Sequence, residues 1–199
     1  DALLPNIAPL LKSSRFVKHV VATGPNGLEA SLSGFSDQFE PAPTTCDDAC
    51  FWLYSSGSTG APKGTVHLHS HLSLTAELYA KPVLGIRESD VVFSAAKLFF
   101  AYGLGNSLTF PMAVGATTVL MAERPTPDAV FKRLTEKKPT IFYGVPTLYA
   151  ALLVNPNFPK KEQLSLRVCT SAGEALPPEI LKRWNERTAT ELLDGIGST

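Results

Sequence analysis

Short apolar runs typical of strands alternate with helix-like segments, and this alternation restricts the fold of the chain more than any other feature. The expected strands are Val17–Val21, Phe51–Tyr54, Val91–Ser94, Thr117–Met121, Thr140–Tyr143, Arg167–Thr170 and Glu191–Leu193. The expected helices are Ser70–Ala80, Leu104–Ala113, Pro127–Glu136, Pro146–Leu153 and Pro178–Arg187. Repeated strand–helix alternation predicts an α/β fold, with largely parallel sheets covered by helices.

Charge and hydropathy exclude several classes of partner. The 199 residues carry 18 basic and 18 acidic side chains, and this balance does not favour binding to nucleic acid or to an anionic membrane. Residues Leu98–Ala122 are uncharged and long enough to span a bilayer. Glycines, a proline and several hydroxyl side chains interrupt them, however. We therefore predict a buried helix, a turn at Val114–Gly115 and a core strand rather than a membrane span.

The cysteines and the first residue bear on the setting of the protein. Cys46, Cys50 and Cys169 match neither CxxC nor a zinc pattern, which favours a reduced, cytoplasmic compartment, with Cys169 as a small buried residue. The chain starts with Asp1 and no signal segment follows, so we expect an excised piece of a longer protein. Residues 24–50 are predicted to be a long connection.

The stretch "YSSGSTGAPKG" at 54–64 offers little to bury but many groups that bind an anion. Its glycines let backbone N–H groups approach a phosphate, its hydroxyls add donors, and Lys63 adds a positive charge. It follows an expected strand, and strand ends in open α/β sheets bind ligands. The Walker and dinucleotide-binding patterns and the nucleophile elbow do not match.

This order of residues resembles the phosphate loop of the adenylate-forming enzymes. Two later stretches agree in the right order: "SAGEALPPE" at 171–179 resembles the adenine-side loop, and "DGIGST" at 194–199 resembles the next nucleotide motif. Within that superfamily, "KLFFAYGLGN" at 97–106 and "IFYGVPTLYAALL" at 141–153 resemble the aryl-CoA ligase branch, benzoate-CoA ligase and its hydroxybenzoate relatives most of all. The resemblance implies that residues 1–199 are a fragment of the large N-terminal AMP-binding domain and that the C-terminal lid domain is absent from the chain.

The resemblance also implies a two-step reaction. The carboxylate of a small aromatic acid, benzoate above all, attacks the α-phosphorus of ATP, and the thiol of coenzyme A then attacks the acyl-adenylate. Positioning and charge neutralisation carry most of the catalysis in such transfers, and Mg²⁺ neutralises the polyphosphate. Without the lid domain and its lysine, the fragment is not expected to turn over by itself.

The resemblance assigns three groups of residues to the nucleotide. The β- and γ-phosphates are assigned to Ser55, Ser56, Gly57, Ser58, Thr59, Gly60 and Lys63. The adenine and ribose are assigned to Gly173, Glu174 and Ala175, and the next wall to Asp194, Gly195, Ile196, Gly197, Ser198 and Thr199. Lys63 and Thr199 are the expected catalytic residues. No metal ligand is expected within the chain, because the family's glutamate follows the position of Thr199.

The acyl pocket is expected at the "FFAYG" segment. The implied lining residues are Ala101, Tyr102, Ala172, Gly195 and Ile196. Aromatic walls suit a small flat acid. The neighbouring Phe99 and Phe100 either add bulk to the pocket or pack in the core.

The stretch "HLHSH" at 67–71 raises a metal site as an alternative. Period-two spacing places His67 and His69 on one strand face, but no acidic or cysteine partner is nearby. We predict instead a strand that leads into a helix with Ser70 as its N-cap.

Three other functions remain open at this point. A hydroxybenzoate or other aryl-acid ligase differs from a benzoate ligase by as little as one pocket residue. A peptide-synthetase adenylation domain is less favoured, because such domains carry an aspartate where this chain has "FFAYG". A non-catalytic nucleotide-binding module would bind ATP without forming an adenylate.

Overall fold

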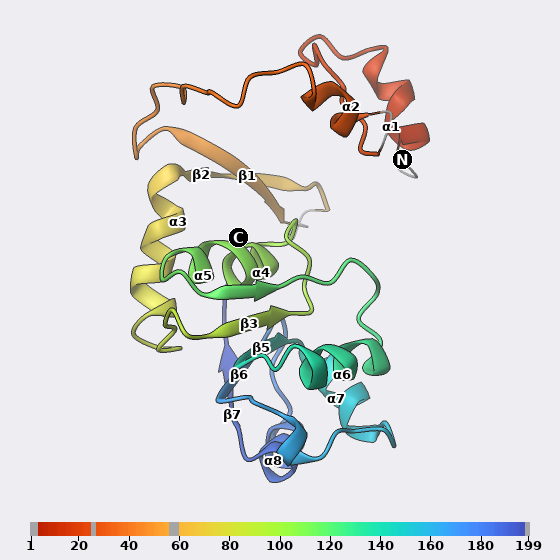
Figure 1. Cartoon of the computed structure of the whole chain (residues 1–199), viewed down its shortest axis with the longest axis vertical. Helices are drawn as coiled ribbons and strands as arrows, with labels where there is room; N and C mark the ends of the chain where they lie inside the picture. Colours follow the sequence, from red (N-terminus) through yellow and green to blue (C-terminus); the bar gives the residue numbers. More distant parts are fainter. Residues whose placement is uncertain (1–3, 25–26, 56–59, 198–199) are drawn as a thin grey trace. The chain divides into compact units, whose positions relative to one another are not determined.

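A computed structural model describes residues 4–24, 27–55 and 60–197. The chain divides into two compact units, Asp1–Thr44 and Thr45–Thr199, and each is described by itself (Figure 1). The first unit contains two short helices, α1 (Leu4–Leu11) and α2 (Leu28–Leu32), neither of which was predicted. The strand expected at Val17–Val21 is wrong: these residues have no regular structure, and its three valines are exposed. A β-branched run forms a strand only where a partner strand and a packing surface are available.

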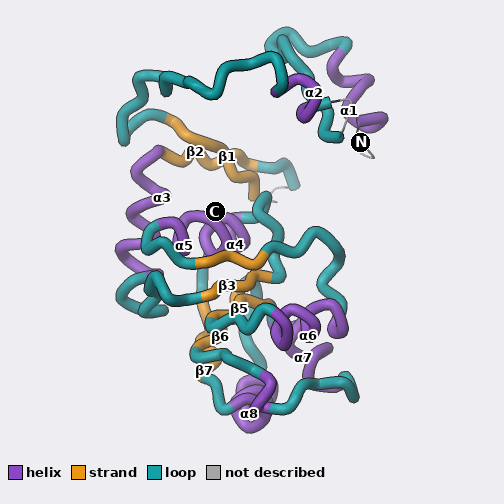
Figure 2. Tube along the Cα trace, in the orientation of Figure 1, coloured by secondary structure: helices purple, strands orange, loops and turns teal. Residues whose placement is uncertain are grey.

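A five-stranded sheet forms the centre of the second unit (Figure 2). In spatial order its strands are β4 (Thr117–Val119), β3 (Val91–Ser94), β5 (Ile141–Gly144), β6 (Val168–Ala172) and β7 (Glu191–Gly195). All four neighbouring pairs run parallel. The predicted α/β class with a largely parallel sheet is therefore confirmed.

Two hydrophobic clusters cover the two faces of this sheet. Phe93, Phe142 and Cys169 point to the cluster that helices α6 (Pro127–Glu136), α7 (Pro146–Val154) and α8 (Pro178–Thr188) complete. The alternate strand residues, such as Ile141 and Tyr143, point to the other cluster. Because strand side chains alternate between faces, a parallel sheet that is covered on both faces needs such nearly unbroken apolar runs.

The helical segments that pack against the cluster containing Ile141 and Tyr143 include π-helical turns. The expected helix Ser70–Ala80 is divided between α3 (His69–Thr75) and the π-helix η1 (Ala76–Ala80). The expected helix Leu104–Ala113 consists of α4, η2 and α5, which occupy Ala101–Leu104, Gly105–Thr109 and Phe110–Met112. The turn predicted at Val114–Gly115 is present and leads into β4. A short 3₁₀ turn, η3, occupies Lys161–Gln163.

The Leu98–Ala122 segment thus folds as a helical layer, a turn and a short strand, as predicted. Among the residues that the structure describes, no helix has both the length and the apolar character needed to cross a membrane.

A separate antiparallel hairpin corrects one sequence-based inference. Strands β1 (Ala49–Ser55) and β2 (Lys63–Leu68) pair only with each other, so the glycine-rich stretch connects a hairpin and does not follow a strand of the parallel sheet. The apolar residues of β1 suggest a buried strand, but Trp52 and Tyr54 are exposed. Only the end of strand β2, where it leads into the next helix, was predicted. The whole strand is a six-residue run broken by polar residues, which gives a weak periodic signal.

Strand β2 also moves the start of the helix that follows it. Leu68 is the last residue of β2, and its N–H donates to Nδ1 of His71 at 3.3 Å. The helix therefore begins at His69, with Leu68 in the N-cap position, rather than after Ser70.

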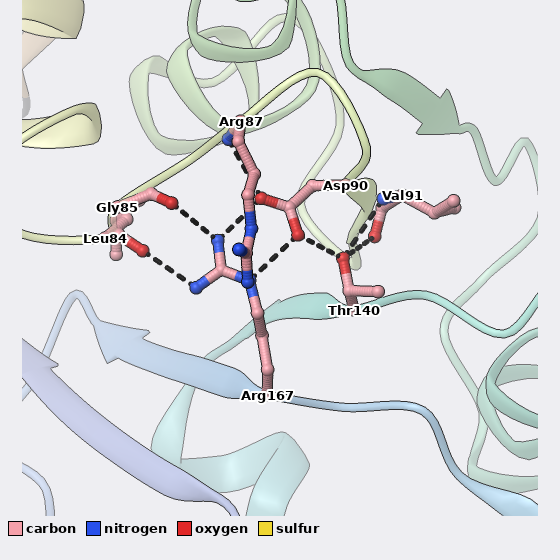
Figure 3. A network of polar contacts seen from close by, with 7 residues as sticks. All are labelled: Leu84, Gly85, Arg87, Asp90, Val91, Thr140 and Arg167. Atoms are coloured by element: carbon pink, nitrogen blue, oxygen red, sulfur yellow. Dashed lines mark hydrogen bonds and ion pairs between the residues drawn. The ribbon is translucent and has the colours of Figure 1, made fainter.

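A polar network joins the residues that precede three of the parallel strands (Figure 3). The guanidinium of Arg167 donates to both carboxylate oxygens of Asp90, and it also donates to the carbonyl oxygens of Leu84 and Gly85. Thr140 Oγ1 donates to Asp90 Oδ1 at 2.7 Å. This network lies at the amino ends of β3, β5 and β6, so it leaves the carboxyl edge of the sheet free for a ligand.

Candidate functional site

The carboxyl ends of three neighbouring parallel strands bring two of the sequence motifs to one edge. Gly144 at the end of β5 is in register with Ser171, and Ala172 at the end of β6 is in register with Gly195 at the end of β7. The segments that follow β6 and β7 therefore leave the sheet side by side. This is the edge at which open α/β sheets bind their ligands.

A hydrogen bond joins the expected adenine-side loop to the end of β7. Gly173 has φ of +97°, a backbone conformation that side chains other than glycine rarely adopt, and it turns the chain sharply after β6. The N–H of Leu176 then donates to Asp194 Oδ2 at 3.3 Å. The structure thus brings the loop of residues 173–176 to Asp194. The two bonded residues, Leu176 and Asp194, lie 18 positions apart along the chain.

Glu174 and Ala175 are exposed and line a shallow pocket. Its other walls are Pro177 and Ile180 at the start of α8, and Pro146, Thr147 and Ala150 of α7. Glu174 and Thr147 are the two polar residues of this lining, and the other lining residues are apolar. Such a surface suits the flat face of a heterocycle with few polar contacts.

The expected aryl-pocket residues gather near the same strand ends. Tyr102, in the first turn of α4, places its hydroxyl 2.7 Å from Oγ1 of Thr170 on β6. Because side chains two positions apart share a strand face, Ala172 lies on the same face as Thr170. Ala172 is in turn paired with Gly195. The structure therefore brings Tyr102, Ala172 and Gly195 together, and Ala101 is exposed beside Tyr102.

The two phenylalanines that precede this turn do not pack in the core. Phe99 and Phe100 are 75% and 57% exposed, and their ring centroids are 4.5 Å apart. Of the two alternatives considered for them, core packing is thus wrong.

The described part of the phosphate-loop stretch lies where strand β1 ends and strand β2 begins. Ser55, the last residue of β1, is paired with Lys63, the first residue of β2, and Lys63 is exposed. Gly60 has φ of +85° and is also exposed. Within residues 60–197, no hydrogen bond or ion pair links Gly60 or Lys63 to the ends of β6 and β7.

Some of the expected nucleotide residues fall outside the described residues, namely Ser56, Gly57, Ser58, Thr59, Ser198 and Thr199. Ile196 and Gly197, which follow β7, are described, and both are exposed.

Burial governs the protonation of the titratable groups around Thr170. Burial raises the pKa of Tyr102 well above its usual range, although the hydrogen bond with Thr170 opposes this. Burial likewise raises the pKa of Tyr149, whose hydroxyl donates to the backbone oxygen of Thr170 at 2.8 Å. The tyrosine hydroxyls therefore stay protonated at neutral pH. Burial also raises the pKa of Cys169 to about 12, which agrees with the prediction of a small buried residue.

His67 at the end of β2 and His71 in α3 contact each other. His67 stacks on Phe51 with ring centroids 4.9 Å apart, and its Nδ1 lies 3.3 Å from Nδ1 of His71. The described residues contain no cluster of three histidine, cysteine or acidic side chains that is arranged to hold a metal ion.

Sequence reasoning missed two residues of this region. These are Thr170, which contacts the hydroxyl of Tyr102, and Tyr149, which bonds the backbone oxygen of Thr170. The partners in both contacts are distant in the sequence. The contact between Tyr102 and Thr170 spans 68 positions, and no local pattern encodes a contact of that range.

This combination of a doubly covered parallel sheet and two motifs at its carboxyl edge defines the large N-terminal domain of adenylate-forming enzymes. Comparison with known proteins agrees: the profile of the family "AMP-binding enzyme" matches residues 3–199, and the chain belongs to that family.

Several aryl-CoA ligases are similar to the chain. The chain is 66% identical to a benzoate–CoA ligase of Thauera aromatica, over 99% of this chain and 38% of that protein. It is 52% identical to a 4-hydroxybenzoate–CoA/benzoate–CoA ligase of Rhodopseudomonas palustris, over 80% of this chain and 30% of that protein. The crystal structure of a benzoate CoA ligase from Burkholderia xenovorans LB400 superimposes with a TM-score of 0.90 and 56% identity, over 99% of this chain and 39% of that chain.

The chain thus spans about two fifths of the length of its closely similar relatives.

Proposed function

We propose that the whole protein is an ATP-dependent acid–thiol ligase that activates benzoate. In the first step the carboxylate of benzoate attacks the α-phosphorus of ATP, which forms benzoyl-adenylate and releases pyrophosphate. In the second step the thiol of coenzyme A attacks the acyl carbon, which forms benzoyl-CoA and releases AMP. Residues 1–199 would form part of the N-terminal AMP-binding domain, and the lid domain would come from outside this chain.

One observation carries the proposal. The segment expected to line the aryl pocket and two of the three segments expected to hold the nucleotide, 173–175 and 194–197, converge on the carboxyl ends of β6 and β7. An enzyme that joins an aromatic acid to AMP must hold the carboxylate and the α-phosphate in contact. The 66% identity to a benzoate–CoA ligase across the same residues supports benzoate as the acid.

The roles of the nucleotide residues follow from their chemistry. Ser55, Gly60 and Lys63, together with residues 56–59, would surround the β- and γ-phosphates with hydroxyl and backbone donors and one positive charge. Gly173, Glu174 and Ala175 would lie along the adenine and ribose. Asp194 would hold that loop in place through its bond to the Leu176 N–H. Residues 195–199 would form the next wall, with the Thr199 hydroxyl near the α-phosphate.

The acid would enter between Tyr102 and the ends of β6 and β7. The lining residues proposed for it are Ala101, Tyr102, Ala172, Gly195 and Ile196. Ala101 and Gly195 leave room for a ring, and Tyr102 supplies an aromatic wall.

A Mg²⁺ ion would neutralise the polyphosphate when it is bound. Phosphate oxygens and water would supply most of its ligands. We also propose a reduced, cytoplasmic setting, because all three cysteines are free and Cys169 is fully buried as a thiol.

A hydroxybenzoate ligase is the second candidate. The Rhodopseudomonas palustris relative is named for both 4-hydroxybenzoate and benzoate, so the branch does not separate the two acids by overall similarity. A non-catalytic nucleotide-binding module is the third candidate, and it differs from both by forming no adenylate.

Pyrophosphate exchange with the whole protein separates the three candidates. Labelled pyrophosphate should enter ATP when benzoate is present, and a panel of hydroxybenzoates, aminobenzoates and aliphatic acids should give slower exchange. Exchange that is faster with a hydroxybenzoate would favour the second candidate. ATP binding without any acid-dependent exchange would contradict the ligase and favour the module.

A further inference from the structure

Thr170 of strand β6 contacts the hydroxyls of two tyrosines, Tyr102 of α4 and Tyr149 of α7. Its side chain is 1% exposed in the middle of β6. Tyr102 Oη of α4 is 2.7 Å from Thr170 Oγ1 and 3.3 Å from the Thr170 backbone oxygen. Tyr149 of α7 donates to that same backbone oxygen at 2.8 Å. None of the motifs in the sequence assigns a role to Thr170.

Both ends of Tyr102 are fixed. At its backbone, Gly103 packs so closely on the preceding loop that a Cβ there would lie 2.0 Å from the Lys97 carbonyl oxygen. At its ring, Tyr143 packs edge-on with the centroids 6.4 Å apart. The hydroxyl is held on β6 by Thr170. The orientation of Tyr102 is therefore determined before any ligand arrives.

The hydrogen bonds of Thr170 decide what Tyr102 offers to an acid in the pocket. One arrangement satisfies both hydroxyls: Tyr102 donates to the Thr170 backbone oxygen, and Thr170 Oγ1 donates to the Tyr102 oxygen. Thr170 then occupies the hydroxyl hydrogen of Tyr102 and one of the two lone pairs on its oxygen, so that Tyr102 offers a ligand its ring carbons and no hydrogen-bond donor. A ligand hydroxyl buried against it would lose water without gaining a donor, which costs binding.

We propose that Thr170 is a positioning residue for substrate preference, and that it favours aromatic acids without a ring hydroxyl by occupying the hydroxyl of Tyr102. This inference rests on the proposed ligase function and adds a specificity determinant to it. Thr170→Val keeps the strand shape and the backbone oxygen but removes the Oγ1 donor. Both lone pairs on the oxygen of Tyr102 then become free to accept a hydrogen bond from a hydroxylated acid.

The test compares benzoate with the three monohydroxybenzoates by pyrophosphate exchange on the whole protein. For each isomer, the ratio of kcat/KM for benzoate to kcat/KM for the hydroxylated acid is measured. In Thr170→Val this ratio should fall about three- to tenfold for at least one isomer, as expected for one hydrogen bond. KM for ATP should change less than twofold. Thr170→Ser, which keeps the hydroxyl, should retain the wild-type ratios within about twofold.

Two further variants separate positioning from a general loss of structure. Thr188→Val alters another buried threonine, in α8, whose hydroxyl bonds the Trp184 carbonyl oxygen, and it should leave the ratios unchanged. In a Tyr102→Phe background, Thr170→Val should no longer change the ratios, because the hydroxyl through which it acts is gone.

The outcomes distinguish the two levels of the argument. Benzoate-dependent exchange in the wild type, with ratios unmoved by Thr170→Val for all three isomers, would overturn the role of Thr170 and leave the proposed function standing. An equal change in the Tyr102→Phe background or in Thr188→Val would overturn it as well. A wild type without benzoate-dependent exchange would overturn the proposed function and this inference together.

Discussion

Arg167 and Asp90 form a two-pronged ion pair at the amino edge of the parallel sheet, with Nε–Oδ1 and Nη2–Oδ2 distances of 2.8 and 2.6 Å (Figure 3). Asp90 is 2% exposed, and both of its oxygens are bonded. The pair joins the chain before β3 to the chain before β6, two strands that are separated in the sheet by β5. It therefore ties together the strands that carry the candidate site at their opposite ends.

Removing one partner of this pair should destabilise the protein strongly. In Arg167→Ala the carboxylate of Asp90 stays buried without its counter-charge, so the free energy of unfolding should fall by about 3–5 kcal/mol. Urea unfolding followed by the fluorescence of the buried Trp184 measures this change. Arg183→Ala, which removes an exposed arginine of α8, is the matched control and should change the value by less than about 0.5 kcal/mol. Equal effects of the two variants would contradict a structural role for the pair.

The same pair predicts how stability depends on pH. Burial tends to raise the pKa of Asp90, but hydrogen bonds from Arg167, Thr140 and the Arg87 backbone outweigh it and hold the pKa below its usual range. A carboxylate with a lowered folded-state pKa stabilises the protein fully above the unfolded value of about 4. That contribution is lost as the pH falls through the lower, folded-state pKa. Unfolding measured from pH 6 down to pH 2 should therefore show a loss of stability in acid that is smaller in Asp90→Asn.

The strands β3 and β5 at the middle of the parallel sheet could be predicted because burial on both faces gives them nearly continuous apolar runs. Val91–Ser94 was predicted at its observed bounds, and so was the helix Pro127–Glu136, whose proline marks the first turn. Two segments could not be predicted in this way. The hairpin strand Lys63–Leu68 was predicted only at its end, and the strand expected at Val17–Val21 is absent from the structure. Pairing decides both of them, and the residues within each run carry little information about pairing.

The features of the candidate site also divide into those that could be predicted from the sequence and those that could not. Glu174 and Asp194 could be placed from their motifs, because each motif follows a predicted strand of one parallel sheet. The bond between the Leu176 N–H and Asp194 could not, since it depends on the register of β6 with β7. Thr170 was missed for a similar reason, because it looks like any other buried strand residue until the fold brings Tyr102 to it.

Asp194 should act on ATP through the loop that it holds. Asp194→Ala removes the acceptor of the Leu176 N–H, so the 173–176 loop loses its bond to β7. KM for ATP should rise about five- to tenfold, as expected for one partly exposed hydrogen bond to a charged group, with a smaller change in KM for benzoate. Asp194→Asn keeps an oxygen that can accept this bond and should lie closer to the wild type. Steady-state pyrophosphate exchange measures both constants, and equal values for Ala and Asn would argue against the bond.

The cysteines should differ sharply in reactivity. Cys169 is fully buried, and burial raises its pKa to about 12, so almost none of it is thiolate at pH 8. Cys46 is exposed. Iodoacetamide at pH 8 should label Cys46 within minutes and leave Cys169 unmodified in the native protein, as read by peptide mass spectrometry. In urea both should be labelled. Labelling of native Cys169 at a rate comparable to Cys46 would show that the sheet opens more readily than its packing indicates.

Lys63 should affect the adenylation step more than it affects binding of the acid. It is exposed at the start of β2, opposite Ser55, and it supplies the one positive charge of the proposed phosphate loop. A charge that neutralises the polyphosphate acts most strongly as pyrophosphate leaves, so Lys63→Ala should slow single-turnover adenylation about 10- to 100-fold. Benzoate affinity, measured separately by equilibrium binding, should change less than threefold, because the acid is proposed to bind between Tyr102 and the ends of β6 and β7. Lys182→Ala removes an exposed lysine of α8 and controls for the general loss of one positive charge. Wild-type adenylation rates in Lys63→Ala would remove the phosphate-binding role, whereas a slowed rate with unchanged benzoate affinity would locate its action at the nucleotide.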